Sequence, residues 1–291
     1  MLISILLACS GEAPTSSPQN IPNPPPGIKS VQKSQDNSTE KRSFELLGCK
    51  EGDFRQPSET SDIECVKKGL GASLVSVQIS LPPAESNNGL SGVFMMQTEV
   101  TQGFYQTVMQ KNPVLDCEKK LNKAIPDPGQ PLYCISFAGA AEFANTLSTK
   151  VGLRPCYSIE TDKITLREGL KCSGYRLPTL IEWRLSIPQI DEGGMGNFAW
   201  YAPNAQEKTH IVAQKQPNTN NIYDGFGNVS EWIWKDEEGG PFSEVLSGEK
   251  RMNIGGSAGD IYVNLQFEAG RNLQSDSIDE GTGFRLLRSI Q

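Results

Sequence analysis

Seven cysteines and a single histidine are the side chains of this sequence best suited to nucleophilic, redox or metal chemistry. No Cys-x-x-Cys pair occurs and His210 is the only histidine, so the spacing argues against a zinc site. Cys9 stands apart near the N-terminus, and the other cysteines form an even set, which favours disulfides in an exported chain. Local spacing predicts the pairs Cys49–Cys65, Cys117–Cys134 and Cys156–Cys172.

A second group of side chains that could bind a ligand or metal consists of the oxygen-bearing residues in NNIYDGFGNVSEWIW, residues 220–234. Its Gly225-x-Gly227 lacks the third glycine and the following helix that a phosphate cradle requires, so a turn is expected there. Hard oxygen ligands suit calcium, although their spacing is not that of an EF-hand loop, and turn and capping roles for the same side chains stay open. The candidate calcium ligands are Asn221, Asp224, Asn228 and Glu231. The sequence implies no other cofactor.

The stretch NIGGSAGDIYVN, residues 253–264, joins a predicted tight turn at Gly255-Gly256-Ser257 to residues that look placed to contact a ligand. It contains no histidine, cysteine or lysine. The question it raises is whether this turn lies beside an active site or beside a surface that only binds.

Two strands and three capped helices are expected to position these groups. SLVSVQISL, residues 73–81, alternates aliphatic and polar residues, and that period of two predicts a half-buried strand. SGVFMMQTEV, residues 91–100, predicts a second strand, and Thr101 is the expected cap of the short helix that follows it. Thr179 and Glu182 stand three apart after RLP, the spacing of a capping box.

The longest predicted helix is SFAGAAEFANTLSTK, with Ser136 as its cap. Its apolar residues recur at helical spacing and should form one buried stripe: Phe137, Ala140, Ala141, Ala144 and Leu147. After Trp183 the sequence shows short apolar runs between Gly, Asn and Asp turns and predicts no long helix. We therefore expect an α+β domain with early helices and a C-terminal half rich in loops and strands.

The N-terminus, MLISILLACSGE, resembles a bacterial lipobox, in which Cys9 would be lipidated. The apolar run has no preceding Lys or Arg and is shorter than a proper signal peptide, and a chance apolar run with a free thiol is the alternative. Residues 10–43 are rich in Pro and Ser and predict a disordered tether. This interpretation divides the chain into a lipoprotein signal at 1–9, the tether at 10–43 and a folded domain at 44–291.

The net charge of −7 over 291 residues argues against binding to a phosphate backbone, so nucleic acid is not an expected partner. The expected partners are the membrane, through the lipid anchor, and an unknown protein or other ligand on a host or cell surface.

Six blocks of the sequence occur in the order found in the formylglycine-generating-enzyme (sulfatase-modifying factor) family. They are VFMMQTEVTQGFYQTVMQKNP, PLYCISFAGAAEFANTLS, GYRLPTLIEWRLS, NIYDGFGNVSEW, NIGGS and GTGFRLLRS. The chain resembles that family over residues 92–288, and the resemblance implies a C-type-lectin-like fold with little regular structure.

The resemblance also bears on catalysis. Family members that oxidise a substrate cysteine carry a cysteine pair, which binds copper, a few residues after the GGS turn. The matching residues here, 258–265, read AGDIYVNL, and the last cysteine of the sequence is Cys172. The related iron-dependent sulfoxide synthases use a histidine cluster, which His210 alone cannot form. The sequence therefore predicts that the chain is not an enzyme of either kind.

Other proteins that share this fold imply a binding role. In variable proteins diversified by retroelements, the diversified segment lies between GGS and the final GFR, and the matching segment here lacks periodicity and is rich in side chains that adaptable binding surfaces use. The expected ligand-contacting residues are Ala258, Asp260, Tyr262, Asn264, Phe267, Arg271, Asn272, Ser275 and Asp276.

These inferences predict a membrane-anchored lipoprotein of the outer membrane or cell surface that binds a ligand through its C-terminal segment. An ordinary surface loop that has lost the family's sequence pattern is an alternative explanation of this segment. A structural or assembly lipoprotein and an enzyme of unknown chemistry on the same fold are the alternatives.

Overall fold

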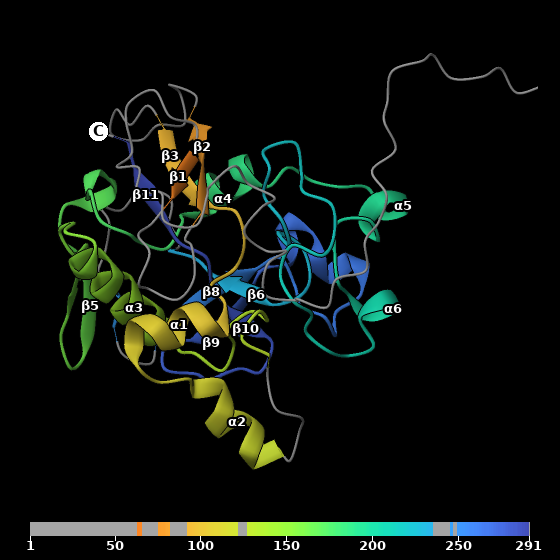
Figure 1. Ribbon diagram of the computed structural model, residues 1–291, viewed down its shortest axis with the longest axis horizontal. Helices are drawn as coiled ribbons and strands as arrows, with labels where there is room; N and C mark the ends of the chain where they lie inside the picture. The colour runs from red at the N-terminus through yellow and green to blue at the C-terminus, as the bar shows by residue number, and fades with distance from the viewer. Residues whose placement is uncertain are drawn as a thin grey trace, which may run out of the picture. The chain divides into compact units, whose positions relative to one another are not determined.

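The two predicted strands form neighbours in one sheet. β2 (Val75–Ser80) buries Val77 and Ile79, as the period of two requires. β3 (Gly92–Met96) is buried along its whole length because it lies between β2 and β11 (Leu287–Ser289). The end of the chain thus returns to pair with the first part of the domain, as Figure 1 shows.

The computed structural model describes residues 63–65, 75–81, 92–121, 127–234, 245–246 and 249–290, all of which fall within residues 40–291. The predicted domain start at residue 44, the tether and Cys9 lie outside the described residues.

Three small sheets organise these residues. The first has the order β1 (Ile63–Cys65), β2, β3, β11 and is antiparallel throughout. The second has the order β10 (Thr282–Gly283), β6 (Ser230–Trp232), β8 (Lys250–Ile254), β9 (Arg271–Gln274). The third has the order β4 (Tyr157–Ile159), β5 (Lys163–Leu166), β7 (Val245–Leu246). In the second sheet β10 runs parallel to β6, and the other pairs are antiparallel.

The three predicted helix caps are confirmed. The Thr101 side chain accepts a hydrogen bond from the backbone of α1 (Gln102–Met109), and Ser136 does the same for α3 (Phe137–Lys150). All five residues of the predicted apolar stripe on α3 are fully buried. Thr179 forms a reciprocal capping box at the start of α4 (Leu180–Ser186).

The remaining helical segments are short. They are α2 (Pro113–Leu121), α5 (Glu192–Met195), α6 (Ala202–Ala205) and the 3-10 turns η2 (Gly169–Lys171), η3 (Tyr262–Leu265) and η4 (Phe267–Ala269). Those after Trp183 agree with the turn-rich sequence there, and neither of the two before it was predicted from the sequence. The mixed α+β class is therefore correct. Within the described residues, no helix combines the length and apolar character needed to cross a bilayer.

Two of the three predicted disulfides are present. Cys117 is bonded to Cys134, and Cys156 is bonded to Cys172, with Cα atoms 6.4 and 5.6 Å apart. The pairing of Cys49 with Cys65 involves a residue outside the described part of the chain.

Candidate functional site

The glycine turn after β8 packs directly on the turn before β6. Gly255 and Gly256 have φ angles of +92° and +70°, which side chains rarely adopt. A Cβ at Gly255 would approach the carbonyl oxygen of Gly225 to 2.9 Å. Ala258 N donates to the carbonyl oxygen of Asn228 at 3.0 Å. The predicted tight turn therefore fixes where residues 258–281 begin, and we call these residues the C-terminal segment.

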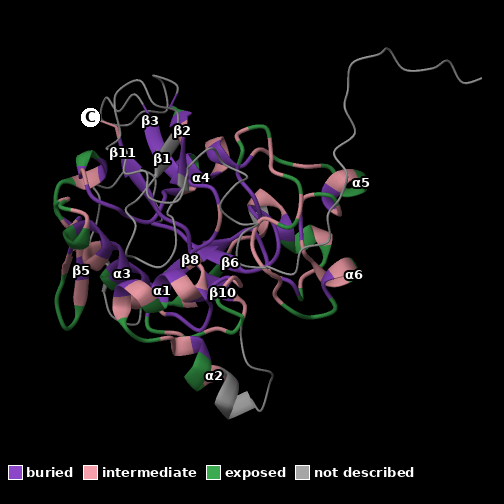
Figure 2. Ribbon diagram, in the orientation of Figure 1, coloured by how far each residue is buried: buried purple, intermediate pink, exposed green. Residues whose placement is uncertain are grey.

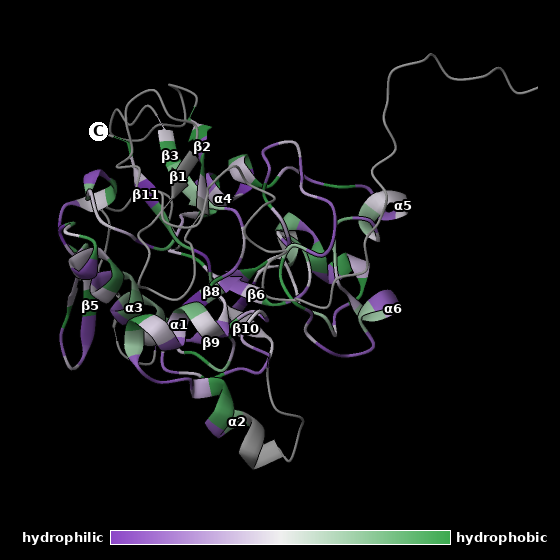
Figure 3. Cartoon of the chain, in the orientation of Figure 1, coloured by the Kyte–Doolittle hydropathy of each residue, from purple (hydrophilic) through white to green (hydrophobic). Residues whose placement is uncertain are grey.

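A buried arginine and carboxylate join the elements near this turn: Glu231 pairs with Ile254 in the sheet, and Arg285 donates to the backbone at Tyr223 and Asp224. Arg285 donates from Nη2 to Glu231 Oε1 at 2.6 Å and from Nε to both carboxylate oxygens, and neither side chain is measurably open to solvent. Trp183 Nε1 donates to the same carboxylate at 2.8 Å. Figure 2 colours the region of β6 and β8 as buried, whereas Figure 3 colours much of it as hydrophilic. The centre of this domain is therefore a polar network rather than a purely apolar core.

The four expected calcium ligands have other roles in this structure. Glu231 is held by Arg285, as described. Asn221, Asp224 and Asn228 have positive φ angles of 58°, 50° and 56°, a conformation that Asn and Asp tolerate better than most residues. The turn role, left open by the sequence, fits these three residues, and calcium binding stays a prediction. Among the described residues, no three His, Cys, Asp or Glu side chains group as metal ligands.

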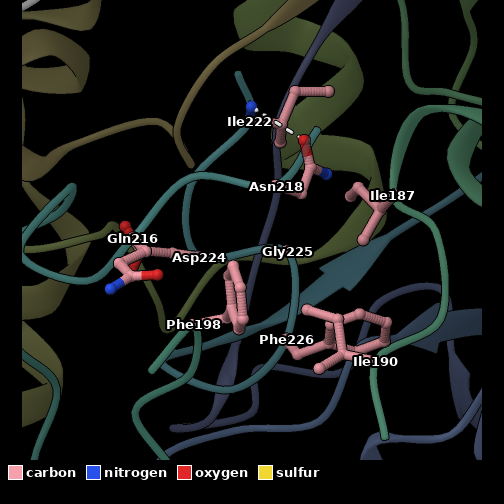
Figure 4. A pocket seen from close by; sticks show the side chains of 9 residues that line it. All are labelled: Ile187, Ile190, Phe198, Gln216, Asn218, Ile222, Asp224, Gly225 and Phe226. Atoms are coloured by element: carbon pink, nitrogen blue, oxygen red, sulfur yellow. Dashed lines mark hydrogen bonds between the residues drawn. The ribbon is translucent and has the colours of Figure 1, made fainter. Parts of the chain in front are cut away.

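Asp224 lies fully buried beside a small cavity, shown in Figure 4. Its Oδ2 accepts from Ala213 N at 2.6 Å, and its Oδ1 has no hydrogen-bond partner in the described structure. Burial raises the pKa of Asp224 to about 6, against the opposing effects of the Ala213 hydrogen bond and the charge of Arg285. Burial, and next the charge of Asp224, hold the pKa of Glu99 well above its ordinary value. The cavity of about 10 Å³ has room for about one water molecule.

The expected ligand-contacting residues fall into three groups by their exposure to solvent. Asn264, Arg271, Asn272 and Asp276 are exposed, Asp260, Tyr262 and Phe267 are partly buried, and Ala258 and Ser275 are buried. The last two side chains therefore do not belong to the exposed surface.

Tyr262 and Phe267 face the domain. The Tyr262 hydroxyl donates to the carbonyl oxygen of Ile190 at 3.1 Å. Phe267 packs edge-on against Trp183 and stacks with Phe226. Removing either ring would disturb packing as well as any contact with a ligand.

The 3-10 turn η3 explains why Tyr262 faces inward. Residues three apart lie on the same side of such a turn, so Tyr262 and the fully buried Leu265 share the inner side. Ile261 and Val263 are left exposed, and Ile278 is exposed further along. The sequence prediction missed these three residues because it treated the segment as lacking periodicity; the three-residue spacing of Tyr262 and Leu265 was the available signal.

Arg271 lies at the centre of the polar part of the segment. It starts β9, is about half exposed, and donates to Ser230 Oγ at 3.0 Å. Its Nη2 lies 3.9 Å from Asp260 Oδ2 and 4.0 Å from Asp279 Oδ2. Because arginine carries five N–H donors and only one is hydrogen-bonded within the described structure, Arg271 can donate to a bound molecule.

Both carboxylates near Arg271 are held in place by their own loops. Asp260 Oδ2 accepts from Ser257 N and Oγ at 2.8 and 2.6 Å. Asp279 Oδ2 accepts from Thr282 Oγ1 at 2.6 Å. The cluster of Arg271, Asp260 and Asp279 is therefore a preorganised group of donors and acceptors at the surface.

The family model for the sulfatase-modifying factor enzyme 1-like domain matches residues 35–290. The chain belongs to this family. Its resemblance to the formylglycine-generating enzymes, inferred from the sequence blocks, is confirmed, and so is the C-type-lectin-like fold of mixed helices and open, loop-rich sheets.

Three relatives of this sulfatase-modifying-factor-like chain extend the comparison. The chaperone protein LppX of Paenibacillus barcinonensis is 26% identical over 247 residues, which cover 71% of this chain and 83% of the relative. The solved structure of Treponema denticola variable protein 1 is 25% identical with a TM-score of 0.65, covering 79% of this chain and all of that one. The structure of CarF is 25% identical with a TM-score of 0.52, covering 74% of this chain and 96% of that one.

The copper chemistry of some family members does not fit the residues present here. Residues 258–265 supply no thiolate, and all cysteines of the sequence precede the segment. The ring of His210 stacks on Trp200 and its Nε2 contacts the carbonyl oxygen of Ala205. These residues therefore do not provide the ligand sets that copper or iron has in the catalytic family members.

Proposed function

We propose that this protein is a membrane-anchored lipoprotein of the cell surface whose C-terminal segment binds a ligand on a non-catalytic sulfatase-modifying-factor-like scaffold. The observation that carries the proposal is the contrast between the fully buried Arg285–Glu231 pair and the exposed side chains of the C-terminal segment. Rigid scaffolds that carry irregular exposed loops are typical of binding proteins.

The relatives support this proposal at a coarser level. One is named a variable protein and aligns over its whole length, which agrees with a segment whose exposed side chains can change while the scaffold persists. Another is named a chaperone, which agrees with binding to other proteins. Diversification by a retroelement belongs to this proposal, and a reverse transcriptase gene beside a near-copy of the 3′ coding region would support it.

The binding site can be tested with arrays of purified proteins and glycans probed with the labelled full chain. A double variant, Ile261→Ser with Val263→Ser, changes two exposed side chains of the segment. The matched control, Ile159→Ser with Ile181→Ser, changes two exposed isoleucines outside it. We expect hits that the first variant loses and the control keeps.

The arrays can also contradict the proposal. Hits that both variants keep would place binding outside the segment, and an absence of hits on either array would favour the structural or assembly lipoprotein.

The anchor has a separate test. Native protein should enter the detergent phase, and Cys9→Ala should remove it from that phase, since stable anchoring requires covalent lipid. Equal partitioning of both forms into the aqueous phase would contradict the lipoprotein assignment.

The enzyme alternative is tested with a peptide that carries a sulfatase-type cysteine motif. We expect no conversion with added copper, because the segment has no thiolate. Turnover above a control without protein would overturn the non-catalytic assignment.

A further inference from the structure

The exposed apolar side chains of the described structure are concentrated in the C-terminal segment. Ile261, Val263 and Ile278 are 56, 59 and 66% exposed. The other large apolar side chains that reach the surface, Leu115, Ile159 and Ile181, are between 36 and 40% exposed and lie on other elements. Exposed apolar side chains that gather in one place mark contact surfaces.

Two of these residues are sequence neighbours of the aspartates that lie near Arg271. Ile261 follows Asp260 in the chain, and Ile278 precedes Asp279. Both aspartates approach Arg271 Nη2 to within 4.0 Å, so their neighbours are brought to the same place although they are far apart in sequence. The tertiary structure therefore brings the backbone at Ile261 and at Ile278 close to one polar cluster.

The charge of the segment narrows the class of partner. Residues 258–281 contain five acidic residues and one basic residue, Arg271. Two of the acidic residues, Asp260 and Asp279, lie within 4.0 Å of Arg271, and Asp276 is exposed; we call these three aspartates the acidic rim of the segment. A negative rim repels nucleic acid and anionic lipid and attracts cationic groups.

The positions of the aromatic residues in the segment narrow the class of expected partner further. The Tyr262 hydroxyl contacts Ile190, and the Phe267 ring packs on Trp183. The segment therefore presents aliphatic rather than aromatic side chains to a partner, whereas a nucleic-acid base or a sugar ring stacks on an aromatic face. Aliphatic side chains pack well against other aliphatic side chains, as at protein interfaces.

We propose that the C-terminal segment binds a polypeptide in which Lys or Arg side chains flank aliphatic ones. Its aliphatic side chains pack against Ile261, Val263 and Ile278, and its cations pair with the acidic rim. Arg271 donates its remaining N–H groups to backbone carbonyl oxygens of the bound polypeptide. This inference rests on the proposed function, because it names the partner class for the same surface.

The probe is a displayed library of short random peptides, selected on the immobilised full chain, and the enriched peptides are then tested on the double variant Ile261→Ser with Val263→Ser. We expect the enriched peptides to combine basic and aliphatic residues. A synthetic copy of the best peptide should bind Ile261→Ser roughly five- to thirty-fold more weakly than the parent, measured by fluorescence anisotropy. Ile159→Ser should bind like the parent.

The ionic contribution to peptide binding can be measured separately, through the salt dependence of affinity. Binding to the parent should weaken as salt rises, and Asp276→Asn should reduce that salt dependence. Glu160→Gln, which changes an exposed carboxylate outside the segment, should leave the salt dependence unchanged.

The outcomes separate this inference from the proposed function. Enriched peptides that are acidic, or that lack aliphatic residues, and still require the segment would overturn the inference and leave the binding function standing. Peptides that bind the double variant as well as the parent would place the contact elsewhere and contradict both. Failure to enrich any peptide would overturn the inference, while the glycan array would still test the function.

Discussion

Two arginines of this protein meet carboxylates in opposite environments. Arg285 and Glu231 form a bidentate pair at 2.6 Å with essentially no solvent exposure, and Trp183 completes the carboxylate's hydrogen bonds. Arg271 lies 3.9 and 4.0 Å from its two aspartates, its side chain is 43% exposed, and among the described residues it makes one hydrogen bond, to Ser230. The first arrangement is complete within the domain, and the second leaves donors for another molecule.

The comparison shows how one fold separates stability from recognition. The buried pair connects β6 with the segment between β10 and β11, and Arg285 also donates to the backbone at Met96 and Tyr223, so a change there should affect the whole domain. The exposed cluster is held by local hydrogen bonds within its own loops, so a change there should affect mainly the surface. The predictions below test this separation.

The largest effect is expected from Arg285→Met. Removing the guanidinium leaves Glu231 buried without its charge partner, which typically costs about 3–5 kcal/mol in the free energy of unfolding. Denaturant unfolding measures this cost, and Arg271→Met is the matched control, with an expected loss of less than about 1 kcal/mol. Equal losses at the two arginines would contradict the separation of scaffold from surface.

The disulfide between Cys156 and Cys172 should contribute the next largest stabilisation. It closes a loop with a sequence separation of 16, for which the chain-entropy model gives about 3 kcal/mol. Cys156→Ala should lower the melting temperature under oxidising conditions. With a reducing agent, the melting temperatures of parent and variant should become similar. Finding both cysteines as free thiols in the native protein would refute the pairing.

The third prediction concerns pH. Because burial raises the folded-state pKa of Asp224 to about 6 from an unfolded value near 3.8, the fold favours the protonated carboxyl. The stability contributed by Asp224 is full below about pH 4 and is lost as pH rises through about 6. The parent should therefore lose on the order of 2 kcal/mol relative to Asp224→Asn between pH 4 and pH 7.

Denaturant unfolding of both proteins across this pH range measures the effect of Asp224 together with its effect on Glu99, whose pKa the charge of Asp224 raises. Glu182 titrates in the opposite sense: burial alone would raise its pKa, but the charge of Arg176 lowers it. A parent that gains stability relative to Asp224→Asn as pH rises would show that the carboxylate, not the acid, is favoured by the fold.

The smallest effect on stability is expected from the double variant Ile261→Ser with Val263→Ser. Both side chains are more than half exposed, and surface substitutions usually change stability by no more than about 0.5 kcal/mol each. The melting temperature should stay near that of the parent. A contrasting variant, Gly256→Val, should damage the fold, because φ is +70° there and a Cβ would approach the Leu265 side chain to 2.9 Å. If the double variant melts like the glycine variant, the segment is part of the scaffold.

The sequence by itself determined the local features of this protein, because they depend on neighbouring residues. The alternation in residues 73–81, the caps at Thr101, Ser136 and Thr179, and the apolar stripe of α3 follow from side-chain period and capping chemistry. The ordered motif blocks likewise determined the family. Two disulfides followed from cysteine spacing alone.

Only the tertiary structure decided which polar residues are scaffold and which are surface. Glu99, Glu231 and Arg285 are far apart in sequence, and nothing local distinguishes their charges from the exposed charges of the C-terminal segment. Asp260 and Asp279 meet at Arg271 because β9 returns antiparallel to β8. The turn η3 directed Tyr262 inward and left Ile261 and Val263 at the surface. The three-residue spacing of Tyr262 and Leu265 is visible in the sequence, but only the fold shows which side of the turn is buried.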